Sequence, residues 1–438
     1  MDANSDKLRV LIIAEAANPE WVSVPLVGWS HAEALSRLVD THVVTQIRNR
    51  DAIERFGWTH GVEFTALDTE SLARPVFRAA DFARTKLHLG WTVVTAAQAL
   101  SYFQFELKVW REFGKRIESG EFDIVHRITP LSPTAPSLIA KRCDRAGVPF
   151  VVGPLNGSVP WPKEFRAEQH REGEFLSYVR DAYKLLPGYR DTRASASAII
   201  AGSRAVLEEM PTEYRDKCVY SPENAIDPDR FGKEAVASTE GPLRVCFIGR
   251  LVPYKGADML IEASAPLLRA GQMTLDIIGD GPERPKLQSM VTERGLEGHV
   301  ELAGWVEHTH LQDRLVQSEV FAFPSVREFG GGVVLEVMAL GVVPVVLDYA
   351  GPSELVTSTT GFKVPMGTRD EVIAGFRAQL SRLCDSKAPL DEMRARGKKR
   401  VRDHYTWDAK AAQTHEVYRW VLGQADRPTR DIPLPDRP

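Results

Sequence analysis

The 438-residue chain has little cysteine, no long apolar run and no large excess of charge of either sign. Its four cysteines are scattered, without a Cys-x-x-Cys pair or the Cys/His spacing of a zinc site. We therefore expect reduced, mostly buried thiols and no metal. No apolar run reaches the ~20 residues that cross a bilayer. A net charge of −4 and a pI near 6.3 give no indication of a nucleic-acid partner.

The N-terminus passes from polar residues directly into an expected strand at 8–14. It lacks the basic and apolar regions of a secretory signal, which together with the reduced cysteines predicts a cytoplasmic protein. Apolar residues make up 43% and charged residues 26%, as in ordinary soluble proteins. The length suffices for two full α/β cores.

Two series of strands alternating with helical stretches follow one another along the chain. In the first half, strands are expected at 8–14, 41–45, 122–126, 149–152 and 198–201. In the second half they are expected at 244–248, 274–278, 300–302, 320–323 and 343–346. The polar stretch 233–240 is the expected linker. This alternation indicates βαβ units and therefore a parallel sheet in each half.

The most informative segment runs from Glu328 to Glu336, where two glutamates bracket Phe329 and a triple glycine. An apolar strand precedes it, and a helix is predicted from about Gly332. Such a junction presents free backbone N–H groups and the positive end of a helix dipole, so it predicts an anion site. Carboxylates beside an anion site make sense if the ligand carries hydroxyls beside its phosphates, as a nucleotide sugar does.

This segment resembles the E-x7-E region of retaining glycosyltransferases of the GT-B fold, in the large family-four (group 1) class. Three further motifs match in order and spacing: Asn224-Ala225-Ile226-Asp227, Ile248-Gly249-Arg250 with Lys255-Gly256, and Ile278-Gly279-Asp280-Gly281-Pro282. The resemblance implies an α/β protein with two Rossmann-like, doubly wound domains facing a central cleft. A C-terminal helix is expected to cross back to the first domain.

The resemblance divides the chain into four parts. Residues 1–232 are the predicted acceptor domain, and residues 241–405 are the predicted nucleotide-sugar donor domain. Residues 406–423 are the predicted returning helix, and the proline-rich residues 424–438 a disordered tail.

The resemblance also implies catalytic residues that stabilise the leaving diphosphate. Arg250 and Lys255 are predicted to contact it, together with the N–H groups of Gly331 and Gly332. This arrangement removes the need for a divalent ion, and we therefore predict no metal site at Asp227-Pro228-Asp229.

Other residues of the second half are expected to bind the rest of the donor. Glu336 is predicted to accept hydrogen bonds from the ribose, and Val306 to contact the base through its backbone. Glu328, a predicted catalytic residue, is expected to orient the sugar hydroxyls with the N–H groups of Phe329 and Gly330.

Two residues of the first half complete the predicted site. His126, also a predicted catalytic residue, ends a strand and resembles the family's cleft histidine, which binds the donor sugar; the alternative is a satisfied structural histidine. Gly28, in the expected first strand–helix loop, would let backbone approach the phosphates or the acceptor. The family usually has a Gly-Gly pair here, and Leu26-Val27-Gly28-Trp29 departs from it.

The predicted function is a retaining, metal-independent glycosyltransferase of glycan or polysaccharide biosynthesis. It would move a sugar from a UDP- or GDP-type donor to a glycan, lipid-linked or small-molecule acceptor. No cofactor is expected, because the nucleotide sugar is a substrate. We find no general base, which fits proton uptake by the leaving phosphate. The alternatives are another enzyme of the same fold, such as a phosphorylase or epimerase, and a non-catalytic nucleotide-sugar-binding protein used in assembly.

Residues 71–116 have a helical pattern with eight basic and three acidic residues and interleaved aromatics. One interpretation is contact with the anionic inner face of the cell membrane, where a lipid-linked acceptor would lie. The other is that the aromatics are core and the basic residues form a solvated face.

Overall fold

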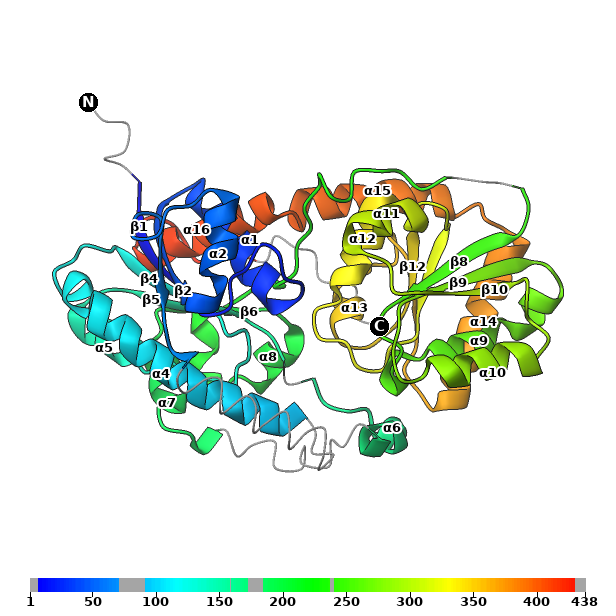
Figure 1. Cartoon of the computed structure of the whole chain (residues 1–438), viewed down its shortest axis with the longest axis horizontal. Coiled ribbons are helices and arrows are strands. Elements are labelled where there is room, and N and C mark those ends of the chain that lie inside the picture. Colours follow the sequence, from blue (N-terminus) through cyan, green and yellow to red (C-terminus); the bar gives the residue numbers. More distant parts are fainter. Residues whose placement is uncertain (1–6, 71–90, 158, 172–183, 237–239, 430–438) are drawn as a thin grey trace. The chain divides into compact units, whose positions relative to one another are not determined.

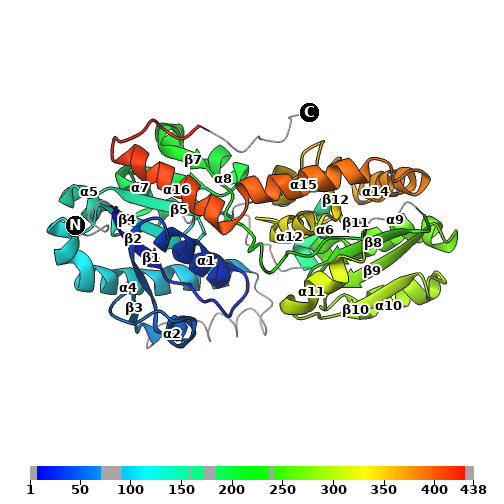
Figure 2. The ribbon, with the colours of Figure 1, turned by 90° about the horizontal axis from the view of Figure 1, so that it is seen from above.

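The protein is described from a computed structural model, over residues 7–70, 91–157, 159–171, 184–236 and 240–429 (Figures 1 and 2). These residues form two compact units. Unit 1 contains the described residues of 7–157, 184–223 and 407–429. Unit 2 contains residues 159–171 and the described residues of 224–406.

Unit 1 is built on a parallel sheet whose order, among the described residues, is β3-β2-β1-β4-β5-β6-β7. Its strands are β1 (Arg9–Ala14), β2 (Asp40–Gln46), β3 (Phe64–Leu67), β4 (Ile124–Thr129), β5 (Phe150–Leu155), β6 (Ala198–Ala201) and β7 (Cys218–Tyr220). Every residue of β1 after Arg9 is buried, as expected of a strand with both faces covered.

Two hydrophobic cores, one on each face of the sheet, hold unit 1 together. Leu11 and Ile13 of β1 belong to the core under α4 (Trp91–Glu118). Val10 and Ile12 belong to the core under α1 (Val24–Ser36) and α16 (Trp407–Val421). The other helices described are η1 (Ile47–Asn49), α2 (Arg50–Phe56), α5 (Ala140–Ala146), α7 (Tyr189–Ser195), α8 (Arg204–Glu209) and η4 (Thr212–Lys217).

The last helix of the chain packs in the first unit. α16 lies along α1 (Figure 2), and its buried residues Ala411, Val417 and Tyr418 belong to the same core as Val10 and Ile12. Because the residues before α16 belong to unit 2, the chain returns to unit 1 between Thr406 and Trp407. The prediction of a returning helix is confirmed.

Unit 2 has a parallel sheet of order β10-β9-β8-β11-β12-β13. Its strands are β8 (Leu243–Ile248), β9 (Met273–Ile278), β10 (Val300–Gly304), β11 (Val320–Phe323), β12 (Val343–Leu347) and β13 (Phe362–Val364). Its described helices are η2 (Lys163–Phe165), α6 (Arg166–Arg171), η5 (Pro253–Lys255), α9 (Ala257–Arg269), α10 (Arg284–Glu293), α11 (His308–Leu315), α12 (Gly332–Leu340), α13 (Ala350–Leu355), α14 (Arg369–Asp385) and α15 (Leu390–His404). The order reverses between β8 and β11, so the loops that follow these two strands lie at a switch point, where ligands bind in such sheets.

The units divide the chain differently from the expected domains. The strap (residues 159–171) lies in the first half of the sequence but packs in unit 2. The chain then changes unit at Glu223–Asn224, before the expected linker. The described start of that linker is bound within unit 2, where Ala235 N donates to the Leu340 carbonyl (2.7 Å) and Val236 N to the Val316 carbonyl (2.9 Å).

The described part of residues 71–116 favours the core interpretation. Tyr102 and Phe105 of α4 are 2% and 0% exposed and belong to the core on the sheet. Residues 71–90, and residues 430–438 of the predicted tail, lie outside the described residues. None of the described helices is long and apolar enough to cross a membrane.

Candidate active site

The carboxyl ends of the unit 2 strands carry most of the predicted site. Arg250 and Lys255 follow β8, the Gly304-Trp305-Val306 segment ends β10, and the Glu328–Gly332 turn follows β11. In a parallel sheet these ends share one edge, and β8 and β11 are neighbours in it. Residues separated by more than 70 positions in the sequence are thus brought to one place.

The central contact of this edge is an ion pair between Lys255 and Glu328. Their side chains are only 15% and 20% exposed, so the pair is partly shielded from water. A lysine ammonium has three N–H donors, and Glu328 occupies one of them. Lys255 therefore retains donors for a phosphate while the carboxylate fixes its position.

The turn between Glu328 and Glu336 leads into α12 without a side-chain cap. Gly331 is the N-cap, with a left-handed φ of 63°, a conformation that favours glycine. A glycine offers no side chain to the first-turn amides. The amide of Val334 donates to the Gly331 carbonyl (2.9 Å), which leaves those of Gly332 and Val333 for another acceptor. Glu336 lies one turn into α12 and is half-buried. This geometry suits an anion at the helix N-terminus.

Two glycines of the Gly-Asp-Gly-Pro motif let neighbouring loops approach closely. A Cβ on Gly279 would overlap the carbonyl oxygen of Gly249, and one on Gly281 would overlap that of Leu251. The backbones of the two loops are also joined by a hydrogen bond, which Leu251 N donates to the Asp280 carbonyl (2.9 Å). These contacts fix the loop that carries Arg250, whose side chain is exposed.

The segment predicted to meet the base is partly accessible. Val306 is half-buried, and the adjacent Trp305 is 68% exposed. The Trp305 indole N–H donates to Glu307 Oε1 at 3.2 Å. The predicted backbone contact of Val306 is compatible with this position and stays a prediction.

Several side chains near the ion pair or the glycine turn had no role assigned from the sequence. Arg327 lies between two rings, with its guanidinium carbon 5.0 Å from the Trp161 centroid and 5.2 Å from that of Phe329. Tyr254 packs edge-to-face on Trp161. The Asn224 side chain lies beside Gly332, 3.5 Å from where a Cβ would be. Trp161 belongs to the strap, so only folding places it here.

His126 lies in the interior of unit 1. It is 0% exposed, and its ring nitrogens bond the Tyr418 hydroxyl (2.6 Å) and the Gly153 carbonyl (2.7 Å). Burial lowers the pKa of His126 to about 4, so the ring is neutral near pH 7. In this conformation the ring has no exposed atom for a sugar. The predicted sugar contact would require one of these hydrogen bonds to open.

Gly28 lies in the second turn of α1 and not in a loop, because the helix already begins at Val24. A Cβ at this position would overlap the carbonyl oxygen of Ala16 and touch the Thr129 methyl at 3.0 Å. The close approach that requires glycine is therefore made by the protein's own backbone. The prediction of a loop at 24–29 was wrong. The contact of Gly28 with the substrate stays a prediction.

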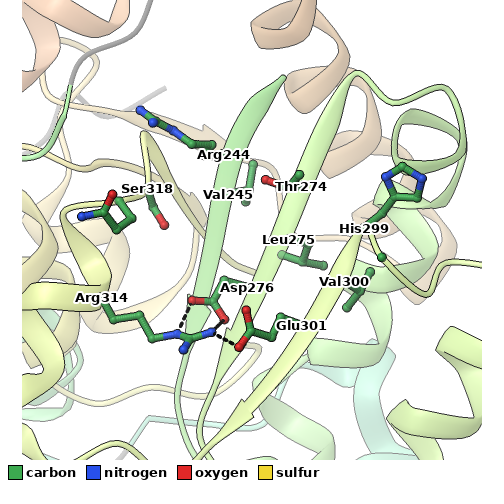
Figure 3. Close-up of a pocket in the computed structure, with 12 residues that line it drawn as sticks. Arg244, Val245, Thr274, Leu275, Asp276, His299, Val300, Glu301, Arg314 and Ser318 are labelled. Atoms are coloured by element: carbon green, nitrogen blue, oxygen red, sulfur yellow. Dashed lines mark hydrogen bonds and ion pairs between the residues drawn. The ribbon is translucent and has the colours of Figure 1, made fainter. Parts of the chain in front are cut away.

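The opposite edge of the unit 2 sheet has a pocket of about 650 Å³ at the amino ends of β8, β9 and β10 (Figure 3). Arg314 spans it, donating from Nε to Asp276 (2.6 Å) and approaching Glu301 through Nη2 (2.7 Å). None of the predicted site residues lines it. Among the described residues, no group of three His, Cys, Asp or Glu side chains is placed to hold a metal ion.

Residues 230–400 match the family described as glycosyl transferases group 1. The matched segment lies within unit 2. The matched segment contains Arg250, Lys255, Val306 and the whole of Glu328–Glu336, but neither the strap nor His126 and Gly28.

The chain is similar over part of its length to curated glycosyltransferases. The chain is 32% identical over 154 residues to the alpha-D-kanosaminyltransferase of Streptomyces kanamyceticus, covering 33% of this chain and 40% of that protein. It is 32% identical over 237 residues to a GDP-mannose-dependent alpha-(1-6)-phosphatidylinositol monomannoside mannosyltransferase of Mycolicibacterium smegmatis, covering 49% and 57%. The chain spans about half the length of the curated relatives it matches.

The fold of the whole chain matches solved glycosyltransferases. HepE of Anabaena, solved in complex with UDP and glucose, aligns with a TM-score of 0.57 at 15% identity, covering 93% of this chain and 98% of HepE. At this identity the likeness concerns the fold alone. With the two parallel sheets, it confirms the predicted α/β class of GT-B type.

Proposed function

We propose that the protein is a retaining glycosyltransferase that takes a sugar from a nucleoside-diphosphate sugar at the carboxyl edge of unit 2. The observation that carries this proposal is the Lys255–Glu328 ion pair beside the uncapped start of α12. It combines a cation and free amides for phosphates with a carboxylate for hydroxyls. The name of the HepE structure, with UDP and glucose, supports a donor of this class.

The first role is stabilisation of the leaving group. Negative charge builds on the diphosphate as the bond to the anomeric carbon breaks. Arg250, Lys255 and the amides of Gly331 and Gly332 would offset that charge in the transition state, without a metal ion. The leaving phosphate oxygen would take the proton of the acceptor hydroxyl, on the face from which it departed. Retention of configuration follows from that same-face attack.

The second role is orientation of the donor. Glu336 would accept hydrogen bonds from the ribose hydroxyls, and Val306 would meet the base through its backbone. Glu328, with the amides of Phe329 and Gly330, would hold the sugar hydroxyls next to the leaving group. The carboxylate that fixes Lys255 thereby also fixes the reacting carbon relative to the cation.

The acceptor would be a glycan, a lipid-linked sugar or a small molecule. The names of curated relatives cover these classes: a glycogen synthase, a phosphatidylinositol monomannoside mannosyltransferase and a 2-deoxystreptamine glucosyltransferase. A lipid-linked acceptor would place the enzyme at the inner face of the membrane. The buried aromatics of α4 give that location no support from the described part of the segment.

The test is donor hydrolysis, without acceptor, across a panel of UDP- and GDP-sugars in excess EDTA. We expect slow release of one nucleoside diphosphate, with sugar of retained configuration. A strict need for Mg²⁺ or Mn²⁺ would exclude the metal-free mechanism. Tight donor binding without turnover, with or without candidate acceptors, would favour the alternative of a non-catalytic binding protein.

A further inference from the structure

The strap brings an aromatic side chain from the first half of the sequence to the two loops of the ion pair. Trp161 packs edge-to-face on Tyr254, with ring centroids 6.0 Å apart and an interplanar angle of 87°. On the same ring, the Arg327 guanidinium carbon lies 5.0 Å from the centroid. Tyr254 immediately precedes Lys255, and Arg327 immediately precedes Glu328. Trp161 therefore contacts the neighbour of each partner in the ion pair.

The position of Trp161 is fixed by the residues around it in the strap. The Tyr349 hydroxyl donates to the carbonyl of Pro160 at 2.7 Å, next to Trp161. Phe165 of the strap is 1% exposed, and α6 packs against η5. The strap is thus anchored on both sides of the tryptophan, and its ring is held against unit 2.

The two loops are also joined to each other behind the ion pair. Val326 N donates to the Tyr254 carbonyl at 2.9 Å. The Ser325 hydroxyl lies 3.4 Å from that carbonyl and 3.3 Å from the carbonyl of Arg327. Trp161 contacts one side chain of each loop, so a separation of the loops that carry Lys255 and Glu328 would also disturb its ring contacts.

We propose that Trp161 is a positioning residue of the donor site, acting through Tyr254 and Arg327 on the Lys255–Glu328 pair. Trp161 is not expected to touch the sugar or the phosphates. This proposal rests on the proposed function. A misplacement of reacting groups by ~1 Å can cost ~100-fold in rate. Small movements of these loops should therefore affect turnover more than folding, since the loops lie at an edge of the unit.

The test compares Trp161→Ala with Trp161→Phe. The indole N–H of Trp161 finds no acceptor among the described residues, so the ring and not the N–H should matter. We expect Trp161→Ala to lower kcat for donor hydrolysis by ~10-fold or more, and Trp161→Phe to retain most of the rate. The affinity for the nucleoside diphosphate alone, measured by calorimetry, should stay within about threefold, because Arg250 and the α12 amides are untouched. Lys163→Ala, an exposed change on the same strap, is the control and should behave as wild type.

Arg327→Met supplies a second and independent variant. If Trp161 acts through Arg327, the double variant should lose less than the product of the two single losses. An unchanged kcat in folded Trp161→Ala would overturn the proposal. The proposal would also be overturned if Trp161→Phe lost as much kcat as Trp161→Ala and if that loss paralleled the fall in Tm. Should Trp161→Ala fail to fold, a wild-type kcat for Arg327→Met would overturn it. If the wild-type protein neither binds nor turns over any nucleotide sugar, the proposed function fails first and the inference with it.

Discussion

The predicted site residues of the two units differ in their exposure and in their contacts. In unit 2, Lys255 and Glu328 meet at the carboxyl edge of the sheet and keep partial exposure of 15% and 20%. In unit 1, His126 and Gly28 are buried, with contacts to Tyr418, Gly153 and Ala16. The ion pair of unit 2 keeps some exposure to solvent, whereas the two predicted site residues of unit 1 are enclosed by the protein's own atoms. The predicted binding role therefore needs a conformational change at His126 but not at Lys255 or Glu328.

The largest effect is expected from removing the cations of unit 2. Arg250→Ala with Lys255→Ala should lower the donor hydrolysis rate by ~100-fold or more, because both groups meet charge that develops in the transition state. Stability should fall far less, since Arg250 is exposed and the Lys255–Glu328 pair is only partly shielded from water. The measurement is kcat beside the thermal midpoint.

Lys399→Ala gives the control for loss of a lysine in the same unit. Its ammonium pairs with Asp403 one turn along α15, on an exposed face. Its rate should stay within about twofold of wild type. Equal losses in the two proteins would remove Arg250 and Lys255 from the site.

The next effect concerns the ribose. Glu336→Ala should weaken nucleotide binding by about 1.5–3 kcal/mol for each charged hydrogen bond lost. Calorimetry with a nucleoside diphosphate measures it, and a folded variant with unchanged affinity would exclude Glu336 from the ribose. Glu293→Ala, at the exposed end of α10, is a control for loss of a glutamate in unit 2.

Much of the fold and part of the candidate site could be predicted from the sequence, for physical reasons that differ between regions. The glycines of the Glu328–Glu336 turn have a backbone role, so their pattern reports local geometry directly. The alternation of apolar runs likewise predicted two parallel sheets. His126 could not be assigned in this way, because its partner Tyr418 lies 292 residues further along the chain. The strap contact of Trp161 with Arg327 is equally nonlocal, and nothing in either segment alone indicates it.

A stability prediction tests the packing role of Gly28. Gly28→Ala should destabilise the protein by about 1–3 kcal/mol, because its Cβ would overlap the Ala16 carbonyl. Gly397→Ala is the matched change in α15, where the new Cβ would meet Met338 at an ordinary 3.8 Å. That variant should be neutral or gain about 0.5–1 kcal/mol. Denaturant unfolding of both variants checks this, and equal stability would contradict the packing role of Gly28.

The last effect is the pH dependence of stability that His126 contributes. The pKa of this ring is lowered by burial to about 4 in the folded state, against an ordinary value near 6.5. Between these values the unfolded chain binds more protons, so stability falls as the pH drops from about 6.5 toward 4. His126→Gln should make that decline shallower, with His31, whose pKa burial also lowers, leaving a residual slope.

Thermal unfolding between pH 7 and pH 4 measures this slope, and His415→Gln on α16 is the control for loss of a histidine. An unchanged slope in His126→Gln would contradict the buried, neutral ring. Donor hydrolysis by the same variant tests its other role. A rate near wild type would leave His126 as a packing residue, and a specific loss of transfer with intact nucleotide affinity would support the predicted sugar contact.

The central claim is that nucleotide sugar binds at the carboxyl edge of unit 2, beside Lys255 and Glu328. Hydrogen–deuterium exchange with and without a saturating nucleoside diphosphate tests it most directly. The account predicts slower exchange in peptides that cover 249–256 and 327–336, with no change at 298–301 and 314–318 around the pocket of Figure 3. Protection confined to that opposite edge would contradict the account.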